Sequence, residues 1–318
     1  MSPNTVAMRD ALIDRIWQSM ANNKKIFFVC ADFGSPILDR IRNDFPNRFV
    51  NVGIAEQNLI NVSAGLGLEG FTVFAYAIAP FITMRCYEQA RVSLALMSKV
   101  RTMNVNLIGV GAGYSYVVSG PTHQCYEDIT LMRAMPNFRV LSPSDHVASA
   151  ALFDLCLANM GPKYLRLDAQ VLPSIYQDTT NAVFEGYYEI ASGSDICFIA
   201  TGYMVHTAKK VIQELSDLNL SIGLIDVIDL TGFDKPKFLK SLSKYSKFVS
   251  LEEGFKGRGG LDSMLFNLFV EESVNKPLLN IGVLGDYRFE LGSRLELHEQ
   301  VGIGPEAVLA KVKNFLLN

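Results

Sequence analysis

Side chains that carry metal or disulfide chemistry are scarce in this sequence, and they are not grouped. The 318 residues include only four histidines and five cysteines, with no C-x-x-C pair. Widely spaced cysteines in odd number, inside apolar segments, predict free thiols in a reducing compartment rather than a disulfide framework. We therefore expect buried thiols that act as small hydrophobic groups, a cytoplasmic location and no metal site on this chain. The cysteines are Cys30, Cys86, Cys125, Cys156 and Cys197.

Long apolar runs, basic clusters and the common cofactor loops are also missing. The apolar runs are of strand length, and the polar start of the chain does not match a secretory signal. The formal net charge is −3 and no cluster of Lys and Arg marks one face, so we expect neither nucleic acid nor a membrane as a partner. The sequence has no G-x-x-x-x-G-K-[ST], no G-x-S-x-G, and no G-x-G-x-x-G that follows a strand and opens a helix.

Short β-branched or aromatic runs alternate with helical patterns along the chain. Hydrophobic residues make up 49% of the sequence, which is enough for two domains with their own cores. The alternation predicts an α/β fold with largely parallel sheets. Strands are predicted at 25–32, 48–53, 72–77, 104–111, 138–143, 163–168, 195–202, 221–230 and 247–253, and helices at 9–21, 56–68, 87–97, 126–135, 146–159, 205–219, 259–273 and 304–318.

The weakest pattern lies between about residues 169 and 194, which include Pro173 and a polar stretch at 177–181. Proline and polar clusters of this kind are typical of connections between periodic segments. We therefore predict a first domain at 1–175, a linker at 176–194 and a second domain at 195–318.

Ligands of α/β proteins bind at the loops that follow the strands, which here are 32–35, 53–56, 109–113 and 119–123. Glu56 opens a predicted helix, so it either complements the helix dipole or presents a partly buried carboxyl to a ligand nitrogen. Taken alone, the features in these loops have ordinary structural interpretations. Asp32 fits a cap or turn, His123 fits a structural histidine, and the aromatic stretch 74–81 with Tyr87 fits a core.

Taken together and in order, the segments resemble the transketolase family over nearly the whole chain. The similarity is closest to the separately encoded C-terminal subunits of split transketolases. It implies a pyrimidine-type thiamine-diphosphate-binding domain followed by the α/β C-terminal domain of the family. The matching motifs are G-I-A-E-Q-N (53–58), 81–89, G-P-T-H-Q (120–124), 128–137 and 142–145, and in the second domain 200–202, 250–253, 259–261 and 281–286.

The resemblance implies transfer of a two-carbon ketol unit from a ketose to an aldehyde, with thiamine diphosphate as the cofactor. Glu56 matches the glutamate that contacts N1′ of the aminopyrimidine, where a carboxyl in an apolar pocket is suited to proton sharing. Phe81 and Tyr87 match aromatic residues that line the same pocket. Met84 falls where the family often has a stacking aromatic ring, and Asp32 matches an aspartate near the cofactor.

The predicted substrate residues depart from the family pattern. His123 matches a histidine that reaches substrate hydroxyls, and Ser35 and Arg166 are predicted to contribute. Ser119, however, stands where typical transketolases have an aspartate, and Gly111 offers no phosphate-binding side chain. Because loss of an anion clamp is costly for a phosphorylated substrate, we expect a substrate other than the ordinary pentose phosphate. Unphosphorylated sugars, nucleotide-linked sugars and other 2-keto compounds remain open.

The resemblance also implies a partner. The family holds the diphosphate and Mg²⁺ with a G-D-G…N segment on a separate domain, and this sequence has none, since Gly285-Asp286-Tyr287 lies in the wrong domain. Magnesium binds through few protein ligands and through phosphate oxygens. We therefore expect an N-terminal partner subunit that carries the diphosphate and Mg²⁺ site, in an α₂β₂ assembly.

Three alternatives share part of the pattern. The β subunit of a 2-oxo-acid dehydrogenase E1 component has the same domain and glutamate, although the G-P-T-H-Q turn favours a transketolase. Deoxyxylulose-phosphate synthase is normally one chain with its own diphosphate domain. The presence of Glu56 and His123 argues against a non-catalytic paralogue.

Overall fold

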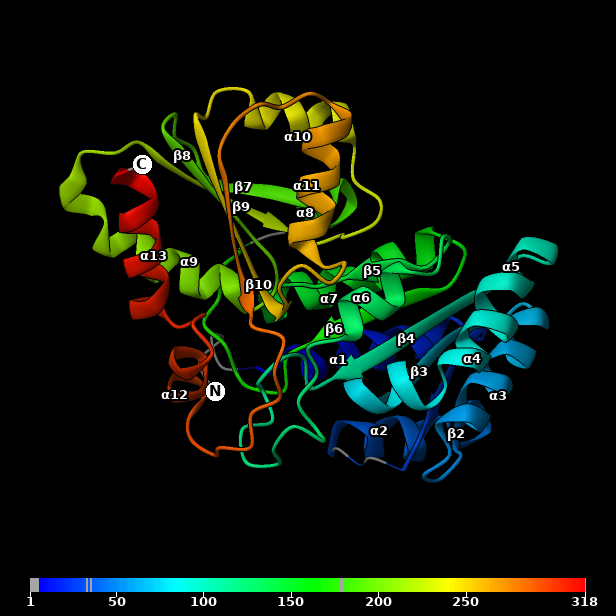
Figure 1. The fold of residues 1–318 in the computed structure, drawn as a ribbon. Helices are drawn as coiled ribbons and strands as arrows, with labels where there is room; N and C mark the ends of the chain where they lie inside the picture. Colours follow the sequence, from blue (N-terminus) through cyan, green and yellow to red (C-terminus); the bar gives the residue numbers. More distant parts are fainter. Residues whose placement is uncertain (1–5, 33, 35, 178–179, 318) are drawn as a thin grey trace.

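The computed structural model describes residues 6–32, 34, 36–177 and 180–317. It consists of two α/β units, one built on each of two sheets (Figure 1). No helix in these ranges is both long and apolar enough to cross a membrane.

The first unit is built on a six-stranded parallel sheet with the order β2-β1-β3-β4-β6-β5. The two central strands are buried along nearly their whole length, as expected of a parallel sheet covered on both faces. All six predicted strands of this unit are present. Their bounds are β1 (Ile26–Cys30), β2 (Phe49–Asn51), β3 (Thr72–Ile78), β4 (Asn104–Val110), β5 (Arg139–Leu141) and β6 (Lys163–Leu167).

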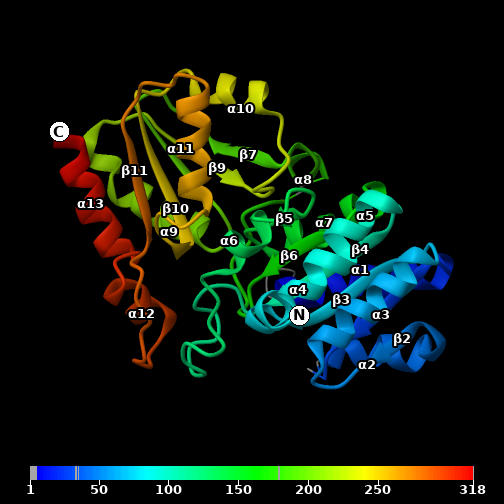
Figure 2. The same cartoon turned by 45° about the vertical axis from the view of Figure 1, so that its right-hand side comes forward.

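Helices cover both faces of this sheet (Figures 1 and 2). The apolar sides of α1 and α7 pack on one face, and α3 with the helical segment 81–100 packs on the other. The bounds are α1 (Met8–Asn22), α2 (Pro36–Asp44), η1 (Pro46–Arg48), α3 (Glu56–Leu68), η2 (Phe81–Arg85), α4 (Tyr87–Gln89), η3 (Ala90–Leu96), α5 (Met97–Val100), α6 (Asp128–Arg133) and α7 (His146–Ala158).

The second unit has a five-stranded sheet with the order β11-β10-β8-β9-β7, in which only β7 is antiparallel to its neighbour. Its core lies between this sheet and the helices α9, α11 and α13. The bounds are α8 (Thr180–Glu185), β7 (Tyr187–Ala191), β8 (Ile196–Ala200), α9 (Met204–Glu214), η4 (Ser216–Leu218), β9 (Ile222–Val227), α10 (Lys235–Leu242), β10 (Lys247–Phe255), α11 (Leu261–Glu271), β11 (Leu278–Val283), α12 (Arg294–Gln300) and α13 (Pro305–Leu317).

The linker predicted at 176–194 is wrong in its second half. Residues 187–191 form β7, whose Tyr187 lies opposite Val227 of β9 in an antiparallel edge pair. An edge strand needs only one apolar face, and the four described residues after Tyr187 are exposed or half-buried. The strand residues, Y-Y-E-I-A, do not alternate regularly between apolar and polar side chains, so the sequence pattern does not indicate a strand there.

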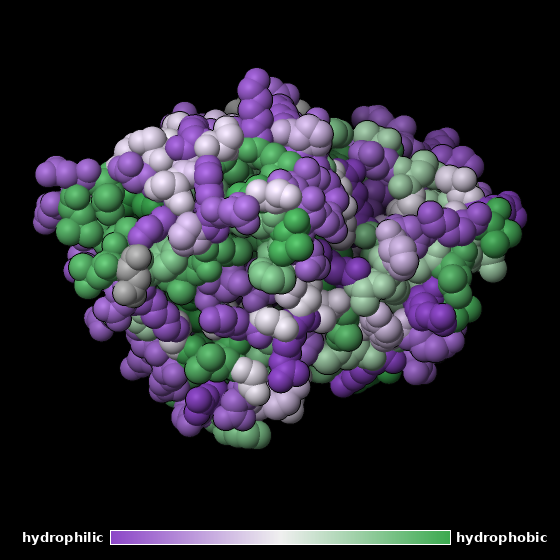
Figure 3. Space-filling model, turned by 45° about the horizontal axis from the view of Figure 1, so that its top comes forward, coloured by the Kyte–Doolittle hydropathy of each residue, from purple (hydrophilic) through white to green (hydrophobic). Residues whose placement is uncertain are grey.

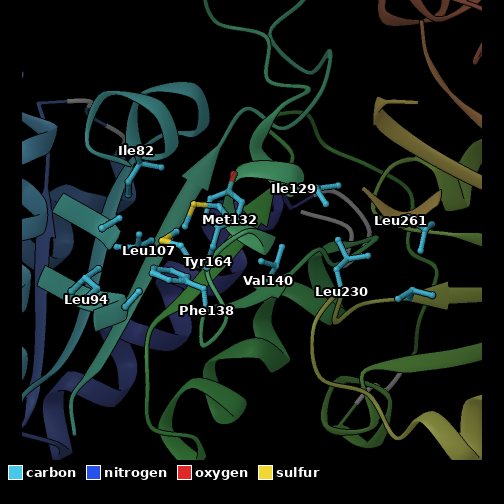
Figure 4. Packing of buried hydrophobic residues seen from close by; sticks show 14 of the residues in the cluster. Ile82, Leu94, Leu107, Ile129, Met132, Phe138, Val140, Tyr164, Leu230 and Leu261 are labelled. Carbon is cyan, nitrogen blue, oxygen red and sulfur yellow. The ribbon is translucent and has the colours of Figure 1, made fainter. Parts of the chain in front are cut away.

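The two units share a continuous core and a backbone connection. Apolar side chains such as Val140 and Ile129 of the first unit lie in one cluster with Leu230 and Leu261 of the second (Figure 4). Next to this cluster, the Ser142 amide donates to the Ile228 carbonyl at 2.7 Å, and the Leu230 amide donates to the Val140 carbonyl at 2.9 Å. Apolar packing and backbone hydrogen bonds therefore both attach the second unit to the first at the carboxyl end of β5. The face in Figure 3 is mixed, with hydrophobic groups interspersed among hydrophilic side chains.

Candidate active site

The loops that follow β1 and β2 are joined by one side chain at the carboxyl edge of the first sheet. The side-chain oxygen of Asn51 accepts from the amide of Gly53 at 2.9 Å and from the amide of Asp32 at 3.1 Å. Gly53 has a φ of +74°, which favours glycine, and Asp32 has a φ of +52°. This turn leads directly into α3 and places Glu56 at its first position.

Glu56 is nearly buried, with 6% of its side chain exposed, at the N-terminus of α3. Small residues on α3 allow this helix to pack close to the sheet. At Gly67 the approach is so close that an added Cβ would lie only 2.9 Å from Val105 Cγ2. The glutamate lines a cavity of about 460 Å³ together with Ile54, Ala55, Gln57, Asn58 and Arg85.

Arg85 contacts the carboxylate of Glu56 directly. Its Nη1 lies 3.1 Å from Oε1 and 3.3 Å from Oε2 of Glu56, and its guanidinium lies 3.8 Å from the centre of the Phe81 ring. The Phe81 ring in turn meets the His123 ring edge-on, with 5.2 Å between the centroids. Arg85 thus links two predicted site residues, Glu56 and Phe81, and the Phe81 ring contacts a third, His123.

The segment that carries Phe81 and Arg85 is a π-helical stretch, η2, rather than a regular helix. The Thr83 hydroxyl donates to the Ala79 carbonyl at 2.7 Å, and the Cys86 thiol donates to the Ile82 carbonyl at 2.9 Å. π-Helical turns of this kind are frequent at functional sites. The helix predicted at 87–97 is likewise split, into α4 and the π-helical η3.

The remaining predicted cofactor residues lie near this centre in different settings. Met84 is partly exposed on η2, and Asp32 is exposed at the end of β1. Tyr87 is half-buried against the apolar core, and its hydroxyl donates to the Leu131 carbonyl of α6 at 3.1 Å. No group of three or more His, Cys, Asp or Glu side chains in the described part of the chain is placed to hold a metal.

The predicted substrate loop is a tight turn on the same side of the molecule. Gly120 has a φ of +67°, and its carbonyl accepts from the His123 amide at 3.1 Å. The Thr122 hydroxyl lies 3.0 Å from His123 Nδ1 and donates to the carbonyl of exposed Ser119 at 3.3 Å. The turn therefore presents the imidazole toward Phe81. Ser35 lies outside the described residues.

Arg166, for which the sequence predicts a substrate-binding role, lies at the junction of the two units. Its side chain is buried in β6, where Nε donates to Asp128 Oδ2 at 2.9 Å and Nη2 donates to the Glu253 carbonyl at 2.9 Å. Both bonds are internal, and the second one reaches β10 of the other unit. Arg166 thus connects the two units and does not line the cavity next to Glu56. A buried guanidinium group needs hydrogen-bond acceptors from the protein, and Asp128 and the Glu253 carbonyl provide them.

A second buried charge cluster at the same junction is not visible in the sequence. Arg294 of α12 donates to Asp168 Oδ2 at 2.5 Å and to Glu253 Oε2 at 2.6 Å, and its guanidinium lies 3.6 Å from the centre of the Tyr203 ring. His298 Nε2 lies 2.5 Å from the other Glu253 oxygen. Only the acidic pair at 252–253 belongs to a family motif; Arg294 and His298 carry no local signal.

This cluster supports the loop that bears His123. Glu253 accepts from the amide of Tyr114, at the start of the loop that follows β4, at 2.9 Å. Burial by itself would raise the pKa of Glu253, but Arg294 and His298 hold it well below its usual range. Burial raises the pKa of Asp168, and Arg294 opposes that rise. The loop 111–127 and the loop after β11 project side by side (Figure 2), and the Tyr287 hydroxyl donates to Glu127 at 2.8 Å.

Two α/β units of this topology, with a buried glutamate at the first turn of α3, match one group of proteins. The model of the transketolase pyrimidine-binding domain matches residues 4–174, and that of the transketolase C-terminal domain matches residues 186–308. The chain belongs to the transketolase family. The family and the two-domain α/β fold that the sequence predicts are thus confirmed.

Several relatives are of similar length to this chain. It is 30% identical to a putative transketolase C-terminal section of Methanocaldococcus jannaschii, over 88% of this chain and 86% of that protein. It is 26% identical to one subunit of the apulose-4-phosphate transketolase of Actinobacillus succinogenes, over 96% and 97%. It is 29% identical to a 6-deoxy-6-sulfo-D-fructose transketolase subunit of a Clostridium species, over 95% and 92%.

Solved structures show the same architecture. A split-gene transketolase described as an inactive β4 tetramer superposes with a TM-score of 0.84 at 28% identity, over 97% of both chains. A transketolase variant from Pichia stipitis superposes with a TM-score of 0.80 at 17% identity, over 98% of this chain and 46% of that one. The second likeness shows the fold alone.

Proposed function

We propose that this chain is the C-terminal subunit of a thiamine-diphosphate-dependent, transketolase-type enzyme that moves a two-carbon ketol unit from a ketose to an aldehyde. The observation that carries the proposal is Glu56, a nearly buried carboxylate that lines a cavity and is linked through Arg85 to Phe81, whose ring contacts His123. When bound, the cofactor supplies the covalent chemistry at the ketose carbonyl, which no protein side chain provides.

The residues around the cavity fit the aminopyrimidine half of that cofactor. Glu56 offers a carboxylate with little access to water, where hydrogen bonding to a ring nitrogen is strong. Phe81 offers a ring face, which Arg85 already covers at stacking distance. In this role Glu56 holds a proton at the ring nitrogen, while Phe81 and Tyr87 exclude water, Met84 packs against the ring and Asp32 contributes a polar group at the rim.

His123 is proposed to orient the substrate. Its ring contacts Phe81, so a hydroxyl group of a bound ketose within reach of the imidazole lies next to the aminopyrimidine pocket. Ser119 and Ser35 are proposed to contact the same substrate. The names of the relatives, which act on apulose 4-phosphate and on a sulfonated fructose, support a ketose other than the common pentose phosphates.

The chain is proposed to work only with an N-terminal partner that carries the diphosphate and Mg²⁺ site. The names of the relatives, as a transketolase C-terminal section or as one subunit of a transketolase, support this division. An α₂β₂ heterotetramer suits a family of symmetric assemblies. The five free, buried cysteines support a reducing, cytoplasmic compartment.

The test is the substitution Glu56→Gln in the assembled two-subunit enzyme. It keeps the shape of the side chain and removes its capacity to take up a proton, so kcat should fall by about 10²-fold or more, as for loss of a general acid–base group. Glu69→Gln is the matched control, because Glu69 is exposed at the other end of the same helix. Glu56→Gln with unchanged kcat would remove the basis of the proposal. Turnover of 2-oxo acids with a lipoyl acceptor, but not of ketoses, would favour the E1 β-type alternative.

A further inference from the structure

The two groups that suit the aminopyrimidine ring are both already bound by one side chain of this protein. Arg85 donates to both carboxylate oxygens of Glu56, at 3.1 and 3.3 Å, and its guanidinium carbon lies over Phe81, 3.8 Å from the ring centre. A guanidinium is planar, carries N–H donors on its edge and stacks on aromatic faces. In shape and hydrogen bonding it therefore resembles a protonated nitrogen heterocycle.

The two partners differ in their freedom to move. Glu56 is 6% exposed and stays within the first turn of α3, whereas 47% of the Arg85 side chain is exposed. The backbone of Arg85 is held independently, because the Gln57 side chain donates to its carbonyl at 3.3 Å. The arginine side chain can thus turn outward into solvent while the glutamate and the backbone of η2 remain in place.

We propose that Arg85 occupies the aminopyrimidine position in the free chain and that the cofactor has to displace it from Glu56 and Phe81. This inference rests on the proposed function. In the free chain Arg85 neutralises the Glu56 carboxylate. A buried carboxylate without a partner would be strongly destabilising. On binding, the ring nitrogen replaces the guanidinium on Glu56, and the flat ring replaces it on Phe81. Arg85 acts on the cofactor by competition and is not a catalytic residue.

The consequence is a measurable loss of cofactor affinity caused by Arg85. In the reconstituted two-subunit complex with Mg²⁺, Arg85→Met should lower the Kd of thiamine diphosphate about three- to tenfold, the effect expected for removing a half-exposed ion pair and cation–π contact. Arg85→Lys keeps a charge near Glu56 but loses the planar group, so its Kd should lie between those of the wild type and Arg85→Met. The Kd is measured by calorimetry or by fluorescence quenching, without turnover.

Arg91→Met is the matched control, because Arg91 is an exposed arginine on the next π-helical stretch, η3. Its Kd should equal that of the wild type. Far-ultraviolet circular dichroism of each variant establishes that the fold is kept.

Two results would overturn the inference. The first is an Arg85→Met complex whose Kd is unchanged within about twofold or is weaker than that of the wild type. The second is a structure of the complex with thiamine diphosphate in which Arg85 still bonds Glu56. These results differ from a failure of the proposed function. That failure would be seen as normal turnover by the Glu56→Gln enzyme, independently of the Kd measured for the Arg85 variants.

Discussion

Replacing Arg294 by methionine should destabilise the junction of the two units strongly. The Arg294 side chain is 4% exposed and bonds two carboxylates from different elements, Asp168 after β6 and Glu253 in β10. Methionine fills a similar volume, so the change removes the charge with little loss of packing. It leaves two buried acidic groups without their guanidinium partner, although Glu253 keeps its contacts with His298 and with the Tyr114 amide.

The expected loss of unfolding free energy is about 3–5 kcal/mol, which is the usual effect of removing one partner from a buried ion pair. A matched exposed pair calibrates this value. Arg40 bonds Asp14 at 3.3 Å with 57% of its side chain exposed, and Arg40→Met should cost at most about 1 kcal/mol.

The assay is urea unfolding at pH 7 and 25 °C, followed by tryptophan fluorescence and circular dichroism. Trp17 reports on the first unit, so a fluorescence midpoint that separates from the circular dichroism midpoint would show that the junction has come apart. Combining Arg294→Met with Asp168→Asn should recover part of the loss, because it removes one of the two orphaned charges. A loss below about 1 kcal/mol for Arg294→Met, equal to that of Arg40→Met, would refute the reasoning.

Buried titratable groups give two further predictions. Burial raises the pKa of Asp226 to about 7, while Ser144 and Tyr176 donate to its Oδ2 at 2.6 and 2.8 Å. Since an unfolded aspartate has a pKa near 3.9, the stability from this protonated group is present below about pH 4 and is lost as the pH rises through about 7. Asp226→Asn should therefore raise the melting temperature more at pH 8 than at pH 5, and an equal effect at both pH values would contradict this. Burial also raises the pKa of Cys30 to about 11 and of Cys156 to about 12, so a thiol reagent at pH 8 should modify none of the five cysteines within minutes in the native protein and all five after unfolding.

Much of the architecture follows from local patterns. The predicted strand at 72–77 is β3 (Thr72–Ile78), and the predicted helix at 56–68 is α3 with the same bounds. In both segments apolar residues are frequent and recur at the spacing typical of the element, so the local pattern and the burial in the fold favour the same structure. The edge strand β7 and the π-helical stretch after β3 are not predicted from the pattern. Their form depends on a distant partner strand and on side-chain bonds to the backbone.

The candidate site is predictable in part. The order of family motifs predicts Glu56, Phe81 and His123 as site residues. In the structure Arg85 contacts both Glu56 and Phe81, and the Phe81 ring contacts His123. Arg85 lies within one of the same motifs, yet nothing in the motif indicates its position over Phe81. The motifs place Arg166 at the substrate, and the structure shows it bound to Asp128 and the Glu253 carbonyl.

The sequence by itself determined the alternation of strands and helices and the residue types at each strand end, because these depend on short-range periodicity and on turns. Only the tertiary structure decided which charges are paired. Arg294 meets Asp168 across 126 positions of the chain, and Arg85 meets Glu56 across 29. Pairing at such separations is set by how the sheets and helices pack, and burial then forces each charge to find the acceptor or donor that this packing brings within reach.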